Sequence, residues 1–323
     1  MTQPLALIFP GQGSQQIGML RELAERYSVV RTTFEEAADA LGYDLWQVVQ
    51  EGPAEALNAT ACTQPALLTS SVAVWRVWQE LEGPRPSVMA GHSLGEYSAL
   101  VCAGALPFAQ GVRLVKLRGD AMQAAVPAGE GAMAAILGLE DEAVEQACAR
   151  AADGDVVAAV NYNAPGQVVI AGTKAAVDRA IIACQEAGAK RAMPIPVSVP
   201  SHCDLMRPAA ERLAVAMDEI ELRPPRYTVF QNVDAEAHAD VATLRTRLIE
   251  QLYQPVRWTS CIEAMTARGA EVFIECGPGK VLTGLNKRIA RGSKGLAVND
   301  PDSLSAGLEL ARDAVGPSPM ANG

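Results

Sequence analysis

The hydrophobic and polar positions of the chain predict strands and helices that alternate from its first residues. Leu5–Phe9 is a short apolar run, and the breaker cluster 10–14 follows it, which predicts a strand and then a turn. A second apolar run at 87–90 leads directly into the glycine-flanked segment 91–95, after which apolar residues recur at helical spacing. This segment predicts a strand, a sharp turn and a helix. A further helix is expected to begin at Thr63-Gln64-Pro65, with apolar residues through Trp78.

The pattern from residue 131 to residue 199 predicts a compact unit of its own. The expected elements, in order, are a strand at 132–139, a helix at 140–152, strands at 156–160 and 167–171, a helix at 173–187 and an extended segment at 191–199. The order βαββαβ is that of the ferredoxin-like split pattern. We therefore predict a small ferredoxin-like subdomain at 127–197.

The segments on either side of this unit predict one large, discontinuous α/β domain, residues 1–126 and 198–314. After the insertion we expect an amphipathic helix at 208–220, strands at 227–230 and 271–275, and the helix Val281–Ile289. The expected fold is an α/β-hydrolase-like core with a parallel sheet. The end of the chain, 315–323, is rich in Pro, Ser, Gly and Asn and is predicted to be a flexible tail.

Composition and charge exclude several classes of protein. Of 323 residues, 49% are hydrophobic and 20% are charged, which suits a globular protein with a sizeable core. The net charge of −10 argues against non-specific binding to nucleic acid or to an anionic membrane. The N-terminus lacks a basic region, and the longest uncharged stretch, 56–75, is too polar to span a membrane. These features predict a cytoplasmic location.

The cysteines indicate a reducing environment. There are seven, an odd number, and no two form a C-x-x-C pair. In a chain of this length the pattern favours buried free thiols over a disulfide framework.

The segment Gly91-His92-Ser93-Leu94-Gly95 is the main candidate for chemistry. Between a strand and a helix, G-x-S-x-G places the serine on a strained turn that lifts its Oγ above the sheet, and the glycines relieve clashes with neighbouring backbone. The helix behind Ser93 directs free N–H groups towards an oxyanion formed beside it. The alternative is an ordinary turn with an incidental serine, because the five-residue pattern alone is weak.

A nucleophilic serine needs a base, and histidine is the usual one. The chain has three histidines. His92 adjoins Ser93, so the two side chains should point apart, and His238 lies in a polar, acidic segment. His202 follows a stiff, proline-rich stretch and is the candidate base, although it can also be a hydrogen-bonded loop residue. No two histidines have the spacing of metal ligands, so we expect no metal.

Seven motifs, taken together, resemble the malonyl-CoA:acyl carrier protein transacylases of bacterial type II fatty-acid synthesis. They keep the order of that family from the first strand to about residue 289: Phe9-Pro10-Gly11-Gln12-Gly13-Ser14-Gln15, Thr63-Gln64-Pro65-Ala66, Gly91-His92-Ser93-Leu94-Gly95-Glu96-Tyr97, Arg118-Gly119, Gly166-Gln167-Val168-Val169-Ile170-Ala171-Gly172, Val199-Pro200-Ser201-His202 and Glu275-Cys276-Gly277-Pro278-Gly279-Lys280. The whole ordered set is far more specific than the serine turn alone.

The resemblance implies a role for each of several residues. Ser93 corresponds to the nucleophile and His202 to the general base. Gln12 corresponds to the residue whose backbone N–H joins that of Leu94 in the oxyanion hole. Gln251 is similar to the residue whose backbone carbonyl orients the histidine, a task that an Asp or Glu performs in most hydrolase triads. The pattern of residues alone does not single out Gln251.

Arg118 resembles the family arginine that pairs with the free carboxylate of malonate. The fork of N–H donors in a guanidinium matches a carboxylate at two points. On the local sequence alone, Arg118 can equally be an exposed helix arginine. Ser201, before the histidine, stands where malonyl-specific polyketide acyltransferases often carry Phe. The resemblance still implies malonyl as the substrate, with tolerance for α-substituted malonyl groups left open.

The implied reaction is a ping-pong transfer of malonyl from malonyl-CoA to acyl carrier protein through a malonyl-serine ester. Coenzyme A enters as part of the substrate, no cofactor is expected, and a monomer is plausible. The pair Lys190-Arg191 can meet an acidic carrier protein or simply be solvated surface. Whether the acceptor serves fatty-acid or polyketide synthesis is open. Two other functions remain: an α/β-hydrolase such as an esterase or thioesterase, and a noncatalytic module that docks carrier proteins.

Overall fold

The computed structural model describes residues 5–197 and 199–316, and it contains two separate sheets. The larger sheet has the strand order β7-β2-β1-β8-β9, and all of its pairs are parallel. Its strands are β1 (Leu5–Phe9), β2 (Val88–Gly91), β7 (Thr228–Phe230), β8 (Val272–Cys276) and β9 (Lys294–Val298). Every residue of β1, β2 and β8 is buried, as expected of central parallel strands covered on both faces.

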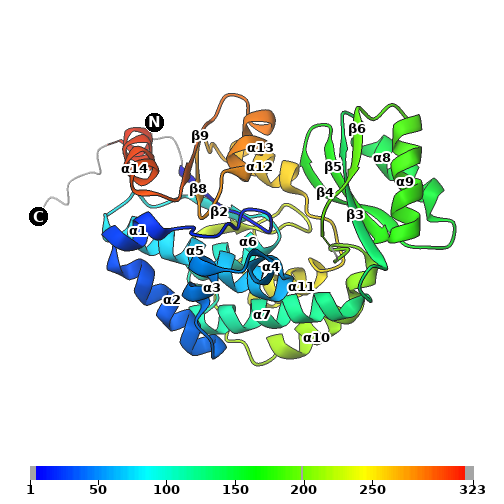
Figure 1. The fold of residues 1–323 in the computed structure, drawn as a ribbon. Coiled ribbons are helices and arrows are strands. Elements are labelled where there is room, and N and C mark those ends of the chain that lie inside the picture. The colour runs from blue at the N-terminus through cyan, green and yellow to red at the C-terminus, as the bar shows by residue number, and fades with distance from the viewer. Residues whose placement is uncertain (1–4, 198, 317–323) are drawn as a thin grey trace, which may run out of the picture.

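Helices cover both faces of this sheet (Figure 1). Alternate residues of β1 point to opposite sides: Leu5 and Leu7 enter a core with α5 and α7, whereas Ala6 and Ile8 enter one with α12 and α13. The helices of this part are α1 (Arg21–Arg26), α2 (Ser28–Leu41), α3 (Leu45–Glu51), α4 (Ala54–Asn58), α5 (Thr60–Glu80), α6 (Leu94–Cys102), α7 (Phe108–Ala125), α10 (Arg207–Met217), α11 (Val241–Glu250), α12 (Trp258–Ala267), α13 (Val281–Ile289) and α14 (Pro301–Val315), with the 3₁₀ turn η1 (Asp204–Met206).

The smaller sheet is antiparallel and has the order β4-β5-β3-β6. Its elements follow the predicted βαββαβ sequence: β3 (Gly131–Leu137), α8 (Asp141–Ala152), β4 (Val157–Ala164), β5 (Gln167–Thr173), α9 (Lys174–Glu186) and β6 (Arg191–Pro194). This is the strand order of a ferredoxin-like unit, and α8 and α9 lie together on its outer side (Figure 1). The predicted fold class is confirmed.

Several element boundaries differ from the prediction. Helix α5 begins at Thr60, so Pro65 lies inside it rather than at its start. Sixteen of its 21 residues are buried, and this burial outweighs the one hydrogen bond that Pro65 cannot donate. Strand β4 continues to Ala164 through residues expected to form a loop, with register shifts where it bends. Strand β9 and the helices α1 to α4, α11, α12 and α14 are not among the elements that the sequence predicted. Of the predicted tail, residues 317–323 lie outside the described part of the chain.

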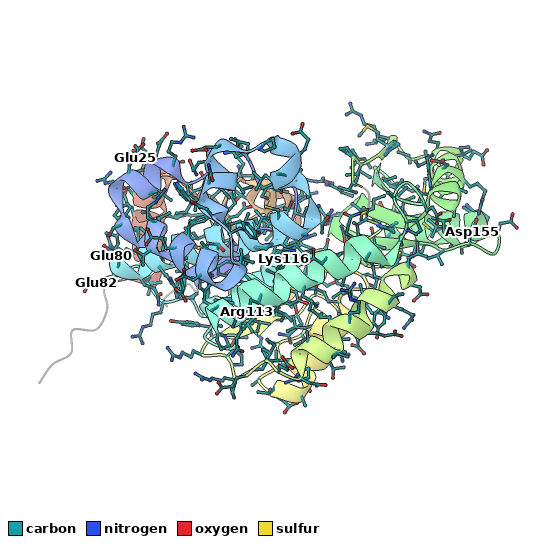
Figure 2. The ribbon with its side chains drawn as sticks, turned by 60° about the horizontal axis from the view of Figure 1, so that its bottom comes forward. Glu25, Glu80, Glu82, Arg113, Lys116 and Asp155 are labelled. Carbon is teal, nitrogen blue, oxygen red and sulfur yellow. The ribbon has the colours of Figure 1, made fainter. Side chains whose placement is uncertain are left out.

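The two sheets are joined where β4 meets the large sheet's loops. The backbone N–H of Tyr162 donates to Val256 O at 3.0 Å, and Val256 N–H donates to Val160 O at 2.8 Å. Helices α7 and α10 pack together along one side of the molecule, which Figure 2 turns towards the viewer. No helix among the described residues is long and apolar enough to cross a membrane.

Candidate active site

The turn after β2 has the geometry that G-x-S-x-G predicts. Ser93 has φ 52° and ψ −108°, and α6 begins at the next residue, Leu94. A Cβ on Gly91 would lie 1.9 Å from the Gly95 carbonyl carbon, and one on Gly95 would lie 2.1 Å from Phe9 O. Such approaches are far below van der Waals contact. Both glycines are therefore required for β1, the turn and α6 to pack together.

The structure brings Ser93, His202 and Gln251 into one chain of hydrogen bonds. The distance from Ser93 Oγ to His202 Nε2 is 2.8 Å, and His202 Nδ1 lies 2.6 Å from the backbone carbonyl oxygen of Gln251. A carbonyl can only accept, so Nδ1 carries the proton and Nε2 is free to accept one from the Ser93 hydroxyl. The backbone N–H of His202, whose φ is 66°, donates to Leu252 O at 3.0 Å. The end of α11 thus holds the ring and the backbone of His202.

His202 is held in its neutral form. Burial is the main cause, and the positive charge of Arg118 adds to it; together they lower the pKa of His202 to about 3. An imidazole with so low a pKa is neutral throughout the physiological range. It can therefore accept a proton without first having to lose one.

Arg118 is buried beside Ser93, with 1% of its surface exposed. Its Nη2 donates to Ser93 Oγ at 3.3 Å and to Gln251 Oε1 at 3.0 Å, and its Nη1 donates to Gln64 Oε1 at 2.9 Å. All three acceptors are uncharged. The other basic residues of α7 labelled in Figure 2, Arg113 and Lys116, lie outside the core. Arg118 is thus not an exposed helix arginine but a buried cation that faces the nucleophile, and within residues 5–197 and 199–316 no carboxylate contacts it.

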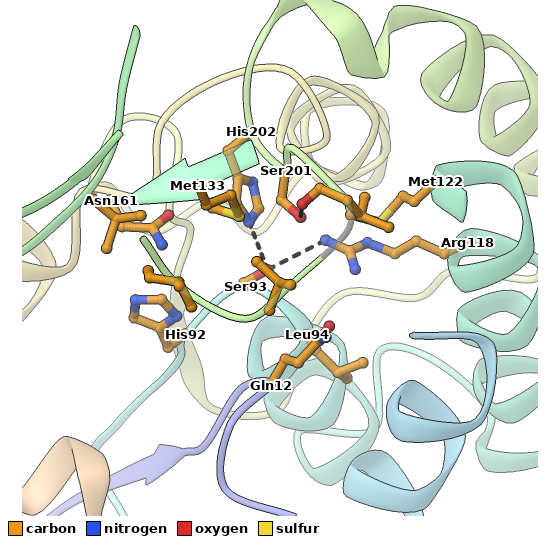
Figure 3. Close-up of a pocket in the computed structure, with 14 residues that line it drawn as sticks. Gln12, His92, Ser93, Leu94, Arg118, Met122, Met133, Asn161, Ser201 and His202 are labelled. Atoms are coloured by element: carbon orange, nitrogen blue, oxygen red, sulfur yellow. Dashed lines mark hydrogen bonds between the residues drawn. The ribbon is translucent and has the colours of Figure 1, made fainter. Parts of the chain in front are cut away.

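Gln12 and Leu94 lie together on the side of Ser93 away from His202 (Figure 3). Gln12 is in the loop after β1, and Leu94 is the first residue of α6. The backbone N–H groups of both have no hydrogen-bond partner among the described residues. Two unpaired donors beside a nucleophile have the features of an oxyanion hole.

The cavity above Ser93 lies between the two sheets. Large-sheet residues form one side, and residues of the small sheet or its last connection, such as Met133, Val169 and Ile195, form the other. Its lining consists of Gln12, His92, Ser93, Leu94, Arg118, Met122, Met133, Asn161, Val169, Ile195, Val197, Val199, Ser201 and His202. An apolar wall with a few convergent polar groups is typical of a small-molecule site.

The other two histidines have different partners. His92 Nε2 lies 2.7 Å from Asn163 Oδ1 on β4, and burial lowers the pKa of His92. His238 Nε2 lies 2.9 Å from Asp234 Oδ2. Among the described residues, Asp234, Glu236 and His238 are the one group close enough to hold a metal ion. Asp234 already accepts hydrogen bonds from His238 and Arg247, and these contacts account for the position of its carboxylate.

The sequence did not assign roles to three buried residues that surround Ser93 and Arg118. Asn232 Oδ1 accepts from the Ser93 backbone N–H at 2.8 Å, and its Nδ2 donates to Gly91 O at 2.8 Å. Glu96, on α6, and Gln64, on α5, are also buried. The signal for the latter two was a polar side chain in a run of apolar helix residues. Asn232 had no comparable signal, because it lies in a polar loop.

Comparisons with known proteins agree over nearly the whole chain. Residues 6–299 match the acyl transferase domain family. The malonyl CoA-acyl carrier protein transacylase of Escherichia coli strain K12 is 58% identical over 310 residues, which cover 96% of this chain and 100% of that protein.

Solved structures give the same result. The crystal structure of an acyl carrier protein S-malonyltransferase from Vibrio cholerae has a TM-score of 0.93 and 62% identity, covering 94% of this chain and 99% of that one. A malonyl-transacylase in complex with a type II PKS acyl-carrier protein has a TM-score of 0.94 and 57% identity, covering 95% of this chain and 99% of that one.

Proposed function

The chain belongs to the malonyl-CoA:acyl carrier protein transacylases, and from this premise we propose how its residues carry malonyl from coenzyme A to the carrier protein. The observation that supports this function best is the position of Arg118. A fully buried guanidinium lies 3.3 Å from Ser93 Oγ, and among the described residues it contacts no carboxylate. An acyl group attached to Ser93 and ending in a carboxylate supplies the missing partner.

In the first half of the cycle, Ser93 Oγ attacks the thioester carbonyl carbon of malonyl-CoA. His202 Nε2 takes the hydroxyl proton, and the N–H groups of Gln12 and Leu94 stabilise the oxyanion. The C–S bond then breaks, and the leaving coenzyme A thiolate takes the proton from His202. The product is a malonyl ester on Ser93, whose carboxylate pairs with Arg118.

In the second half, the phosphopantetheine thiol of the carrier protein gives its proton to His202 and attacks the ester carbonyl. The C–O bond breaks, Ser93 takes the proton back, and malonyl leaves as a carrier-protein thioester. Because the acyl group waits on the enzyme, water must be excluded. We propose that the wall formed by Met133, Val169 and Ile195 serves this purpose. Hydrolysis of malonyl-CoA as fast as its transfer would contradict this.

The site differs from that of an α/β-hydrolase in the group that orients the histidine. A hydrolase triad uses a carboxylate there, whereas the backbone carbonyl of Gln251 accepts from His202 Nδ1. The connected Ser93–His202 pair also argues against a noncatalytic docking module.

The setting of the reaction is also part of the proposal. We propose that residues 1–126 and 198–314 form the large domain and 127–197 the small one. We further propose that the enzyme is a cytoplasmic monomer, uses no cofactor, and supplies extender units for fatty-acid synthesis. Polyketide synthesis is the alternative, favoured by the likeness to a transacylase solved with a type II PKS carrier protein.

The deciding experiment measures the transfer of labelled malonyl from malonyl-CoA to purified carrier protein. We expect mass spectrometry to find a malonyl adduct on Ser93 before the carrier protein is added. Ser93→Ala should lose both the adduct and the transfer. An adduct on another residue, or transfer that survives Ser93→Ala, would overturn the proposal. Fatty-acid and polyketide carrier proteins offered in competition identify the preferred acceptor.

A further inference from the structure

Glu96 is a buried acidic residue that takes no part in the proposed transfer of malonyl. It lies on the first turn of α6, three residues after Ser93, and its side chain is fully buried. Its Oε2 accepts hydrogen bonds from the backbone N–H of Asn232 and from Gln251 Nε2, both at 2.9 Å. Its Oε1 has no partner among the described residues. A buried carboxylate with one oxygen unpaired is costly for folding, so a functional reason for it is worth seeking.

The side chain of Gln251 connects Glu96 to Arg118. Its Oε1 accepts from Arg118 Nη2 at 3.0 Å, while its Nε2 donates to Glu96 Oε2 and, at 3.0 Å, to the backbone carbonyl of Ser93. The amide therefore lies between a buried cation and a buried carboxyl group. Its orientation is fixed, because reversing it would set its NH₂ group against the guanidinium and its oxygen against the carboxylate.

Glu96 also reaches the nucleophile through Asn232. Its Oε2 holds the Asn232 backbone, and the Asn232 side chain accepts from the Ser93 N–H and donates to Gly91 O. One carboxylate oxygen thus fixes the two amide side chains that support the serine turn.

We propose that Glu96 is a positioning residue that orients Gln251 and Asn232 and, through the Gln251 amide, supplies the negative charge that balances Arg118. This inference rests on the proposed pairing of Arg118 with the malonyl carboxylate. When malonyl binds, its carboxylate and an ionised Glu96 face the same guanidinium. Glu96 therefore limits how tightly malonyl is held, whereas it leaves an acyl group without a carboxylate unaffected.

The charge of Glu96 changes in the working range of pH. Burial is the main cause that raises its pKa to about 7, opposed by the hydrogen bonds from Gln251 and Asn232. The other groups that act on it do not titrate there. Burial lowers the pKa of Arg118, but a guanidinium stays charged at these pH values. Burial raises the pKa of Tyr97 to about 12 and also raises the pKa of Cys261, whereas the pKa of Asp234 is lowered.

The test measures rapid acylation of Ser93 by malonyl-CoA and by acetyl-CoA from pH 6 to pH 8.5, using the whole enzyme. In the wild type, the half-saturating malonyl-CoA concentration should rise by roughly three- to tenfold as pH rises through 7, because Glu96 ionises. The acetyl-CoA curve includes the titration of coenzyme A itself but not this effect. The ratio of the half-saturating malonyl-CoA concentration to the half-saturating acetyl-CoA concentration therefore isolates the effect of Glu96.

Glu96→Gln keeps an acceptor oxygen for Gln251 and Asn232 but removes the charge. We expect the ratio to become independent of pH. The half-saturating malonyl-CoA concentration should equal that of the wild type at low pH, and the maximal acylation rate should change little. Glu96→Leu removes the acceptor as well, and it should lower the maximal rate with both substrates. If the ratio in Glu96→Gln still depends on pH as in the wild type, Glu96 does not balance the charge of Arg118. If the maximal rate in Glu96→Leu is unchanged, Glu96 does not position Gln251 and Asn232.

Two variants serve as controls. Glu275 is another buried carboxylate, but it accepts from the Leu282 and Thr283 N–H groups at the start of α13 and has no contact with Arg118. Glu275→Gln should reduce stability and leave the ratio and its pH dependence as in the wild type. His238, which contacts Asp234, is tested by His238→Asn, and the pH dependence should persist. Loss of the pH dependence in this variant would overturn the inference, because Glu96 is intact there.

The outcome for Glu96 can be separated from that for the proposed function. If Ser93 is not malonylated in the wild type, or if Arg118→Ala affects malonyl and acetyl equally, the function itself is wrong. If Ser93 is malonylated and Arg118→Ala is selective, but Glu96→Gln behaves as the wild type, only the role of Glu96 is wrong.

Discussion

Arg118 Nη2 donates to Ser93 Oγ at 3.3 Å, so the cation that is proposed to bind the substrate carboxylate contacts the nucleophile directly. The same guanidinium is the second cause of the low pKa of His202. One buried charge therefore acts on the nucleophile, on the base and on the amide of Gln251.

Replacing Arg118 tests its proposed role in selectivity. Arg118→Ala should reduce kcat/KM for malonyl transfer by roughly 10²- to 10³-fold, because a carboxylate bonded at two points to a buried guanidinium contributes about 3–4 kcal/mol. Acetyl transfer should fall much less. Arg118→Lys keeps the positive charge but not the two-point geometry of the guanidinium, so its kcat/KM for malonyl transfer should lie between those of the wild type and Arg118→Ala. Equal losses with both substrates would favour an α/β-hydrolase instead. The comparison needs kcat/KM for both acyl-CoA substrates.

The pH dependence of the base should change when the charge of Arg118 is removed. Because that charge lowers the pKa of His202 from its ordinary value, Arg118→Ala should raise the pKa, and burial should still keep it below 6.5. The pH below which kcat/KM for acetyl-CoA declines should therefore move upwards in the variant. Assays after brief transfer to pH values from about 2.5 to 7 cover the wild-type decline near pH 3 and limit acid unfolding. A decline at the same pH in both proteins would show that the charge does not reach His202.

Gln251→Ala separates the two functions of this residue. The backbone carbonyl that orients His202 remains, whereas the side-chain contacts with Arg118 and Glu96 are lost. Acetyl transfer should fall by less than roughly tenfold, and malonyl transfer should fall further because Arg118 loses an acceptor that orients it. Steady-state assays with both substrates check this. Gln251→Glu adds a carboxylate beside Arg118 that competes with the malonyl carboxylate, so its KM for malonyl-CoA should rise more than that of Gln251→Ala.

Glu96 should also leave a signature in stability. A carboxyl whose pKa is about 7 when folded binds a proton more tightly than in the unfolded chain, so its stabilising contribution is present below about pH 4.5 and is lost as pH rises through 7. Relative to the wild type, Glu96→Gln should therefore gain up to about 3 kcal/mol of unfolding free energy between pH 4.5 and pH 8. Urea titrations at several pH values measure this difference. A constant difference would show that Glu96 does not titrate abnormally.

Gly95→Ala tests the packing of the serine turn. The added Cβ would lie 2.1 Å from Phe9 O, so β1 or the turn must move. We expect a loss of roughly 2–4 kcal/mol of stability and of nearly all activity. A matched substitution is Gly284→Ala on α13, where nothing lies within 4 Å of the added atom. The midpoint temperature of its thermal unfolding should not decrease. Equal behaviour of the two variants would contradict the close approach.

The sequence was sufficient where function depends on local order. Alternation and apolar runs identified β1, the βαββαβ unit and the strand–turn–helix around Ser93, because period and turn chemistry are local properties. It also supplied His202, Arg118, Gln12, Leu94 and Gln251, but mostly through resemblance to a family. The boundaries of α5 and β4 were predicted wrongly, since burial and contact with Val256 set them and neither is visible in a short window.

Tertiary structure decided which of these residues meet. The sequence separates Ser93 from His202 by 109 positions and from Gln251 by 158, and hydrogen bonds join them only because α11 packs beside the serine turn. Whether Arg118 was an exposed arginine or a buried cation also depended on packing, and packing shifts the pKa values of His202 and Glu96. Burial and the approach of charges are properties of the folded chain. The sequence named the reacting groups, and the fold determined their ionisation and their partners.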